Sequence, residues 1–222
     1  ASEVIVLRAY GETASDQRGL VTGLLLPDAP VVSWWPKECP EGVCDTPLGR
    51  LAQRRITDSA ASSDPVAALD RVAAGYRPGN TDFGWTRLTL WRAQLAAALD
   101  QPPYESITAV EVSGAPDAPS TTLLAAWLKW RLEVPVEVRT EGYAPASGIH
   151  SVVLHRASGP IRLARTEPAV GTLTQPGQPD HEISLARRGL RECLAEELRR
   201  LDPDDVFGAV LAASRESATT TR

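Results

Sequence analysis

The sequence predicts an α/β fold. We expect a mostly parallel sheet with flanking helices over residues 1–141, and an antiparallel β-meander followed by C-terminal helices over residues 142–222. In the first part, short apolar runs alternate with segments of helical periodicity, as in parallel α/β proteins. In the second part, short alternating segments flank turns that contain glycine and proline, which is typical of antiparallel hairpins.

The first part opens with strand signals. Strands are expected at Val4–Leu7 and Pro30–Trp35, and a strand end at Arg54–Asp58. Asp64 and Pro65 predict a helix start, because aspartate caps helices and proline fits their first turn. The later expected elements are a helix capped by Thr81 or Asp82, a strand at Ile107–Val112, a helix capped by Ser120 and a strand at Val134–Val138.

The second part predicts about four short strands. Ser158-Gly159 marks a hairpin, and Pro176–Asp180 marks a second turn. Leucines at helical spacing then predict a helix over Leu190–Leu201. Asp202, which precedes Pro203, is expected to cap the last helix.

Composition limits the classes of partner. The chain has 222 residues, enough for a sizeable core, and a formal net charge of −5. Nucleic acid is a poor partner for such a chain, because phosphate contacts need clustered positive charge. No segment approaches the roughly 18 apolar residues of a membrane span. We therefore expect neither a nucleic-acid nor a membrane partner.

The cysteines and the lack of methionine give two further expectations. An odd number of cysteines, three in all, argues against a secreted disulfide framework and favours the cytoplasm. The chain has no methionine and enters an expected strand by Val4. We infer that residue 1 is not the natural start, and that a missing N-terminal part completes the α/β region.

Two adjacent tryptophans, Trp34 and Trp35, end an apolar run directly before Pro36. Neighbouring side chains of a strand point to opposite faces of the sheet, so both indoles cannot enter the same core. Either both faces are covered, or one indole is left for a partner. Both tryptophans are therefore candidate partner-binding residues.

Arg54 and Arg55 are the other partner-binding candidates. They lie where a strand of an α/β sheet would end, and could hold an anion or a partner's carboxylate. The alternative is a solvated loop in which one of the two arginines pairs with Asp58. The sequence leaves both interpretations open.

Cys39 and Cys44 share a loop that contains proline and glycine. Their spacing fits half of a zinc site, but the chain offers no second pair of ligands nearby, and we expect no metal. Two interpretations stay open, namely unlinked loop thiols and a redox-sensitive pair close enough to form a disulfide.

Catalytic and nucleotide-binding motifs are absent from the sequence. It has no Gly-x-Ser-x-Gly elbow, no Gly-x-Gly-x-x-Gly and no phosphate-binding Gly-Lys-Ser/Thr. Adjacent acids such as Asp204 and Asp205 fit a helix start better than an acid–base pair. We therefore expect no catalytic residue and no cofactor.

Four motifs carry a family resemblance. They are LLLPDAPVVSWWP at residues 24–36, PLGRLAQRRITD at residues 47–58, TDFGWTRLTLWR at residues 81–92 and CLAEELRRLDP at residues 193–203. In this order the chain resembles the glucose-6-phosphate dehydrogenase assembly protein (OpcA) family, particularly its actinobacterial branch. The resemblance covers nearly the whole chain.

The resemblance implies a non-catalytic protein that binds glucose-6-phosphate dehydrogenase and promotes its assembly or activity. It would thereby support NADPH production in the oxidative pentose phosphate pathway. The resemblance implies no catalytic residue. The alternative function is an α/β enzyme or small-molecule sensor that binds a phosphorylated sugar or nucleotide through Arg54 and Arg55.

Overall fold

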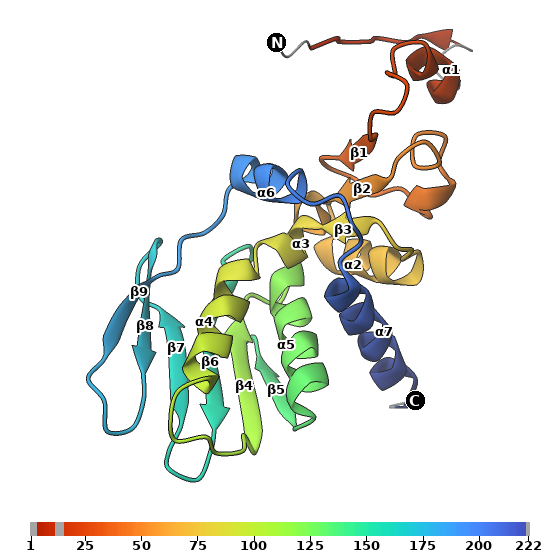
Figure 1. Ribbon diagram of the computed structural model, residues 1–222. Coiled ribbons are helices and arrows are strands. Elements are labelled where there is room, and N and C mark those ends of the chain that lie inside the picture. The colour runs from red at the N-terminus through yellow and green to blue at the C-terminus, as the bar shows by residue number, and fades with distance from the viewer. Residues whose placement is uncertain (1–3, 12–15, 221–222) are drawn as a thin grey trace.

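The chain forms two sheets (Figure 1). The structure is a computed structural model that describes residues 4–11 and 16–220. Its first sheet contains β1 (Val32–Trp35), β2 (Arg54–Thr57) and β3 (Asn80–Asp82) in the order β1-β2-β3. All neighbours in this sheet are parallel, with Trp34 opposite Ile56 and Ile56 opposite Thr81.

The second sheet has six strands in the order β5-β4-β6-β7-β8-β9. Its strands are β4 (Ala109–Gly114), β5 (Val136–Arg139), β6 (Ile149–His155), β7 (Ile161–Arg165), β8 (Val170–Thr174) and β9 (His181–Ser184). Strands β4 and β5 are parallel, and all other neighbours are antiparallel. The predicted α/β fold with a four-strand meander, β6 to β9, is thus confirmed. This sheet crosses the expected boundary at residues 141/142, and the division into domains there stays a prediction.

Helices cover one face of the six-stranded sheet, where the main core lies (Figure 1). The helices of the described residues are α1 (Gln17–Thr22), α2 (Pro65–Ala74), α3 (Phe83–Thr86), α4 (Thr89–Leu99), α5 (Pro119–Leu132), α6 (Leu190–Glu197) and α7 (Asp205–Thr220). Of these, α4 and α5 lie on that face, whereas α1 lies apart from both sheets. Short 3-10 turns occur at Val43–Asp45 and Ser59–Ala61.

Two of the predicted helix starts are confirmed. Asp64 accepts a hydrogen bond from the backbone N–H of Ala67 at 3.0 Å, and Pro65 is the first residue of α2. Asp82 caps α3 by accepting from the N–H of Gly84 at 2.7 Å. Both caps satisfy backbone donors that the helix itself leaves unpaired.

Two predicted caps are wrong. Helix α5 begins at Pro119 after Ala118, so Ser120 lies inside its first turn. Proline supplies the start there because it needs no hydrogen-bond acceptor. The last helix begins later than expected, and Asp204 rather than Asp202 accepts from the N–H of Phe207 at 3.0 Å.

The strand expected at Val4–Leu7 is also wrong. These residues belong to no sheet and have no regular structure. A strand needs a hydrogen-bonded neighbour, and this segment lies apart from both sheets (Figure 1). An apolar, β-branched run is therefore left outside the fold.

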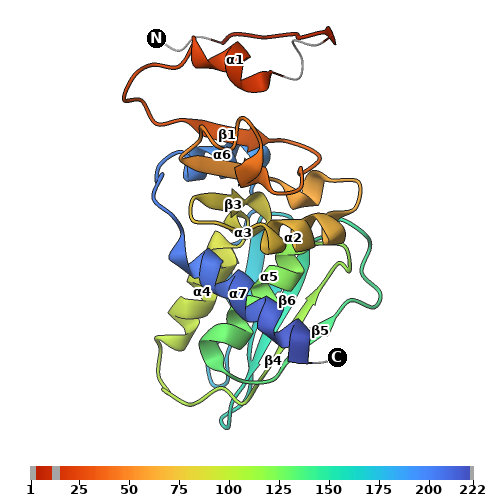
Figure 2. The same ribbon diagram turned by 90° about the vertical axis from the view of Figure 1, so that its right-hand side faces the viewer.

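Helix α7 closes the core by packing on α5 (Figure 2). Its Phe207 is fully buried. The ring centroid of Phe207 lies 5.5 Å from that of Trp85 and 5.7 Å from that of Tyr76. One aromatic side chain thus joins α7 to α3 and to the segment after α2.

We expect Phe207→Ala to lower the free energy of unfolding by about 3–5 kcal/mol, because it leaves a cavity beside Tyr76 and Trp85. Urea unfolding measures the change. Val206→Ala is the control, since Val206 is the neighbouring residue and is 37% exposed. Similar losses for the two variants would contradict the packing role of Phe207.

Candidate functional site

The two tryptophans of β1 lie on opposite faces of the three-stranded sheet. Trp34 packs against a small cluster with Phe83, at 6.0 Å between ring centroids, and Cys193 of α6. Trp35 packs against the main core. Both faces are therefore covered, yet both indoles remain partly exposed because β1 is an edge strand. Their role in partner binding stays a prediction.

Arg54 is buried and connects β2 to the C-terminal segment. Its guanidinium forms an ion pair with Glu197 of α6 and donates to the carbonyl oxygen of Asp202 at 2.9 Å. Thr86 donates to the other carboxylate oxygen of Glu197 at 2.6 Å. The alternative in which Arg54 or Arg55 pairs with Asp58 is wrong, since Asp58 instead accepts two hydrogen bonds from Arg87 at 2.7 and 2.8 Å.

Arg55 is half-buried and is also used internally. Its Nε donates to Oδ1 of Asn80 at 2.6 Å, and its Nη2 donates to the carbonyl oxygen of Pro78 at 2.7 Å. Its Nη1 donates to the carbonyl oxygens of Gly49 and Ala52. The expected role of Arg54 and Arg55 in partner binding stays a prediction, although contacts within the chain occupy both guanidinium groups.

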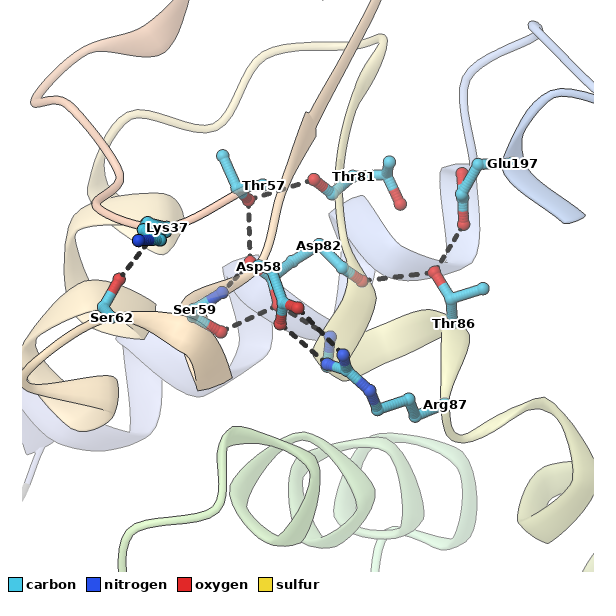
Figure 3. A network of polar contacts seen from close by, with 11 residues as sticks. Lys37, Thr57, Asp58, Ser59, Ser62, Thr81, Asp82, Thr86, Arg87 and Glu197 are labelled. Atoms are coloured by element: carbon cyan, nitrogen blue, oxygen red, sulfur yellow. Dashed lines mark hydrogen bonds and ion pairs between the residues drawn. The ribbon is translucent and has the colours of Figure 1, made fainter. Parts of the chain in front are cut away.

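A buried carboxylate, Asp82, organises the carboxyl ends of β2 and β3 (Figure 3). It accepts hydrogen bonds from the Thr57 hydroxyl at 2.7 Å, from the N–H and hydroxyl of Ser59 at 2.9 and 2.7 Å, and from the N–H of Gly84 at 2.7 Å. Burial raises the pKa of Asp82, and these hydrogen bonds oppose that shift. With no solvent exposure, this carboxylate holds the fold rather than a substrate.

The loop cysteines Cys39 and Cys44 are buried free thiols. Cys44 donates to Oδ1 of Asn80 at 3.1 Å. Burial first, and the charge of Asp82 second, raise the pKa of Cys39 to about 11. Within the described residues, no group of three or more His, Cys, Asp and Glu side chains is arranged to hold a metal ion. Redox pairing of the two thiols stays a prediction.

The sequence interpretation missed an exposed apolar arm, which we define as the described residues before Pro30. Helix α1 contains no buried residue, and the arm lies away from both sheets (Figures 1 and 2). Its exposed apolar side chains are Val4, Ile5, Val6, Leu7, Tyr10, Leu24, Leu25 and Leu26, between 36% and 87% exposed. The apolar run at residues 4–7 was the available signal, but it predicted a strand of the sheet instead.

Among the described residues, no helix has the length and apolar character needed to cross a bilayer. Exposed apolar patches mark sites of contact with a partner protein, a ligand or a membrane surface.

The Arg54–Glu197 pair gives a stability prediction. The two side chains are 5% and 7% exposed, so Glu197→Gln leaves a buried charge without its counter-ion and should cost about 3–5 kcal/mol of unfolding free energy. The control Asp45→Asn breaks the exposed Arg77–Asp45 pair and should cost below about 1 kcal/mol. Equal costs in urea unfolding would contradict a structural role for the buried pair.

The thiol of Cys39 gives a second prediction. A pKa of about 11 instead of 9.0 means an about 100-fold smaller thiolate fraction at pH 8, and the thiolate is the reactive species. We expect iodoacetamide to modify native Cys39 at least about 100-fold more slowly than Cys39 in urea-unfolded protein. Peptide mass spectrometry under reducing conditions measures both rates, and fast native labelling would contradict the prediction.

Comparison with solved structures gives distant matches. The structure of KijD10, a 3-ketoreductase from Actinomadura kijaniata, in its open conformation with TDP-benzene and NADP, matches with a TM-score of 0.50 and 12% identity, over 87% of this chain and 77% of that chain. UDP-N-acetylglucosamine 3-dehydrogenase GnnA from Acidithiobacillus ferrooxidans matches with a TM-score of 0.45 and 10% identity, over 83% and 77% of the two chains. At this identity the KijD10 match indicates a similar fold alone, and no curated protein matches the chain.

Family models cover most of the sequence. The glucose-6-phosphate dehydrogenase subunit N-terminal domain matches residues 1–74, and the corresponding C-terminal domain matches residues 78–211. These matches confirm the family expected from the four motifs, but they give no support to an actinobacterial branch or to a missing N-terminal part. The chain therefore belongs to the OpcA family of glucose-6-phosphate dehydrogenase subunits.

Proposed function

We propose that this chain is a non-catalytic subunit that binds glucose-6-phosphate dehydrogenase and promotes its assembly or activity. It thereby supports NADPH production in the oxidative pentose phosphate pathway. The observation that carries the proposal is the match of both subunit domains, in order, to residues 1–74 and 78–211. The expected cytoplasmic location stays a prediction.

The polar groups of the molecule favour a non-catalytic role. The buried acids Asp82 and Glu197 and both candidate arginines are occupied by contacts within the chain. Oγ of Ser147 and Nε2 of His150 lie 2.9 Å apart. Among the described residues, however, no carboxylate contacts the imidazole of His150 to orient it. The Ser–His pair therefore lacks the third member of a catalytic triad.

The arm and the adjoining edge strand β1 form the surface that we propose for the dehydrogenase. Tyr10 is 78% exposed and Leu26 is 74% exposed. Aromatic residues are enriched among the side chains that dominate binding energy. The arm joins β1 directly, so Trp34 and Trp35 would extend the same surface. The unstructured run Val4–Leu7 has the composition to add as a strand to a partner's sheet.

The alternative, a sensor or enzyme that uses Arg54 and Arg55, has less support. A phosphate-binding arginine needs free N–H donors that face a cavity. Glu197 neutralises the charge of Arg54, and all three guanidinium nitrogens of Arg55 donate to Asn80 or to backbone carbonyls. Neither residue lines the cavity whose wall contains Arg87, Arg165, Arg187 and Arg188.

We expect the purified chain to form a complex with its cognate glucose-6-phosphate dehydrogenase and to raise the rate of NADPH formation. Light scattering after size exclusion gives the mass of the complex, and absorbance at the nicotinamide band gives the rate. In the same assay, Tyr10→Asp should weaken binding about tenfold or more, because it places a charge in an apolar contact.

The matched control is Tyr104→Asp. Tyr104 is also 78% exposed but lies in the loop between α4 and β4, at the far end of the molecule from the arm (Figure 1). This variant should bind normally. Absence of any complex would overturn the proposed function, whereas equal effects of the two variants would overturn only the proposed surface.

A further inference from the structure

A cavity lined by four arginines lies at the first turn of α5. Its volume is about 260 Å³, and the arginines are Arg87, Arg165, Arg187 and Arg188. Arg87 follows α3, Arg165 ends β7, and the other two precede α6. Three segments that are distant in the sequence therefore bring positive charge to one place.

Two of these arginines have carboxylate partners outside the cavity wall. Arg87 pairs with Asp58, and Arg188 pairs with Glu196 of α6. These pairs fix the two side chains and cancel their charge. They do not cancel the charge of the other two arginines.

Arg165 and Arg187 form no ion pair within the described residues. Arg165 donates to the carbonyl oxygens of Ile149 at 3.2 Å and Leu185 at 3.0 Å. Arg187 donates to a backbone carbonyl, that of Ser147. A backbone carbonyl orients a guanidinium without neutralising it.

Asp117 is the acid in the cavity wall, and both of its carboxylate oxygens accept from the N–H of Ala146, at 2.9 and 3.1 Å. The wall therefore keeps an excess of positive charge even when the acids paired with Arg87 and Arg188 are counted. This excess makes the cavity complementary to an anion.

The unneutralised charges of Arg165 and Arg187 repel each other. Burial first, and the charge of Arg187 second, lower the pKa of Arg165 to about 10. Nε of Arg165 is buried and has no hydrogen-bond acceptor. The guanidinium lies 5.4 Å from the ring centroid of Trp91, which also lines the cavity. A bound anion would offset the repulsion between the two arginines.

The first turn of α5 adds to the positive electrostatic potential of the cavity. Ala118, Pro119 and Ser120 line the cavity, and this 14-residue helix has no side-chain cap. The N-terminus of a helix favours negative charge, because its first N–H groups are unpaired and its dipole is positive there. Helix and arginines thus favour the same kind of ligand.

We propose that this cavity binds a small phosphorylated metabolite, with Arg165 and Arg187 holding its phosphate group. Guanidinium groups match phosphate geometry with paired N–H donors. A cavity of about 260 Å³ suits a molecule of sugar-phosphate size rather than a dinucleotide. This binding goes beyond the assembly function and uses neither Arg54 nor Arg55.

The test is isothermal titration calorimetry on the chain alone, with inorganic phosphate, glucose 6-phosphate and glucose at constant ionic strength. We expect saturable binding of at least one phosphate-containing probe and none of glucose. Binding of inorganic phosphate would show that the phosphate group suffices. Binding of glucose 6-phosphate alone would show that the sugar contributes as well.

Variants locate the site. Arg165→Gln and Arg187→Gln should each weaken binding about 10- to 100-fold, because each loses charged hydrogen bonds. Arg50→Gln makes the same charge change at an exposed position outside the cavity and should leave the Kd unchanged. Arg187 is itself exposed, so its variant keeps the test valid if Arg165→Gln fails to fold.

Two results would overturn the proposal. One is the absence of saturable binding of either phosphate-containing probe. The other is an equal loss of affinity in Arg50→Gln and Arg187→Gln, which would indicate a general charge effect. Because the dehydrogenase takes no part in this assay, neither result bears on the assembly function.

Discussion

The buried ion pair of Arg54 and Glu197 joins two parts of the fold that lie far apart in the sequence. It joins the parallel sheet to α6, and Thr86 joins the same carboxylate to the start of the helical layer. The cluster around Trp34 depends on this arrangement, because α6 supplies its Cys193 and Leu194. A charge pair that is costly to desolvate thus fixes the position of a short helix that is otherwise largely exposed.

Local chemistry made much of the fold predictable. Asp64 and Asp82 cap helices within a few residues of their own positions, and the meander follows from alternation around Ser158-Gly159. Pairing across the sequence was not predictable in this way. The sequence offered Asp58 as a possible partner of Arg54 or Arg55, because Asp58 is close in the chain, whereas the partner of Arg54 lies 143 residues away.

The candidate sites show the same difference: a site set by neighbouring residues could be predicted, whereas a site assembled from distant segments could not. Trp34 and Trp35 were found because adjacent strand residues must face opposite ways, and both faces are indeed covered. The arginine cavity could not be found from any motif, since its members come from β7 and from the segments after α3 and before α6. The arm was misjudged because an apolar β-branched run predicts a strand only when a neighbouring strand exists to pair with it.

The arm also has a consequence for how many copies of this chain a cell can tolerate. If the dehydrogenase covers the arm as proposed, a copy without it presents eight exposed apolar side chains among the described residues before Pro30, including the run Val4–Leu7. Such segments promote aggregation and attract chaperones and proteases when no partner covers them. The abundance of this subunit should therefore follow that of its enzyme, with surplus copies removed, so that the ratio of the two is set by protein quality control.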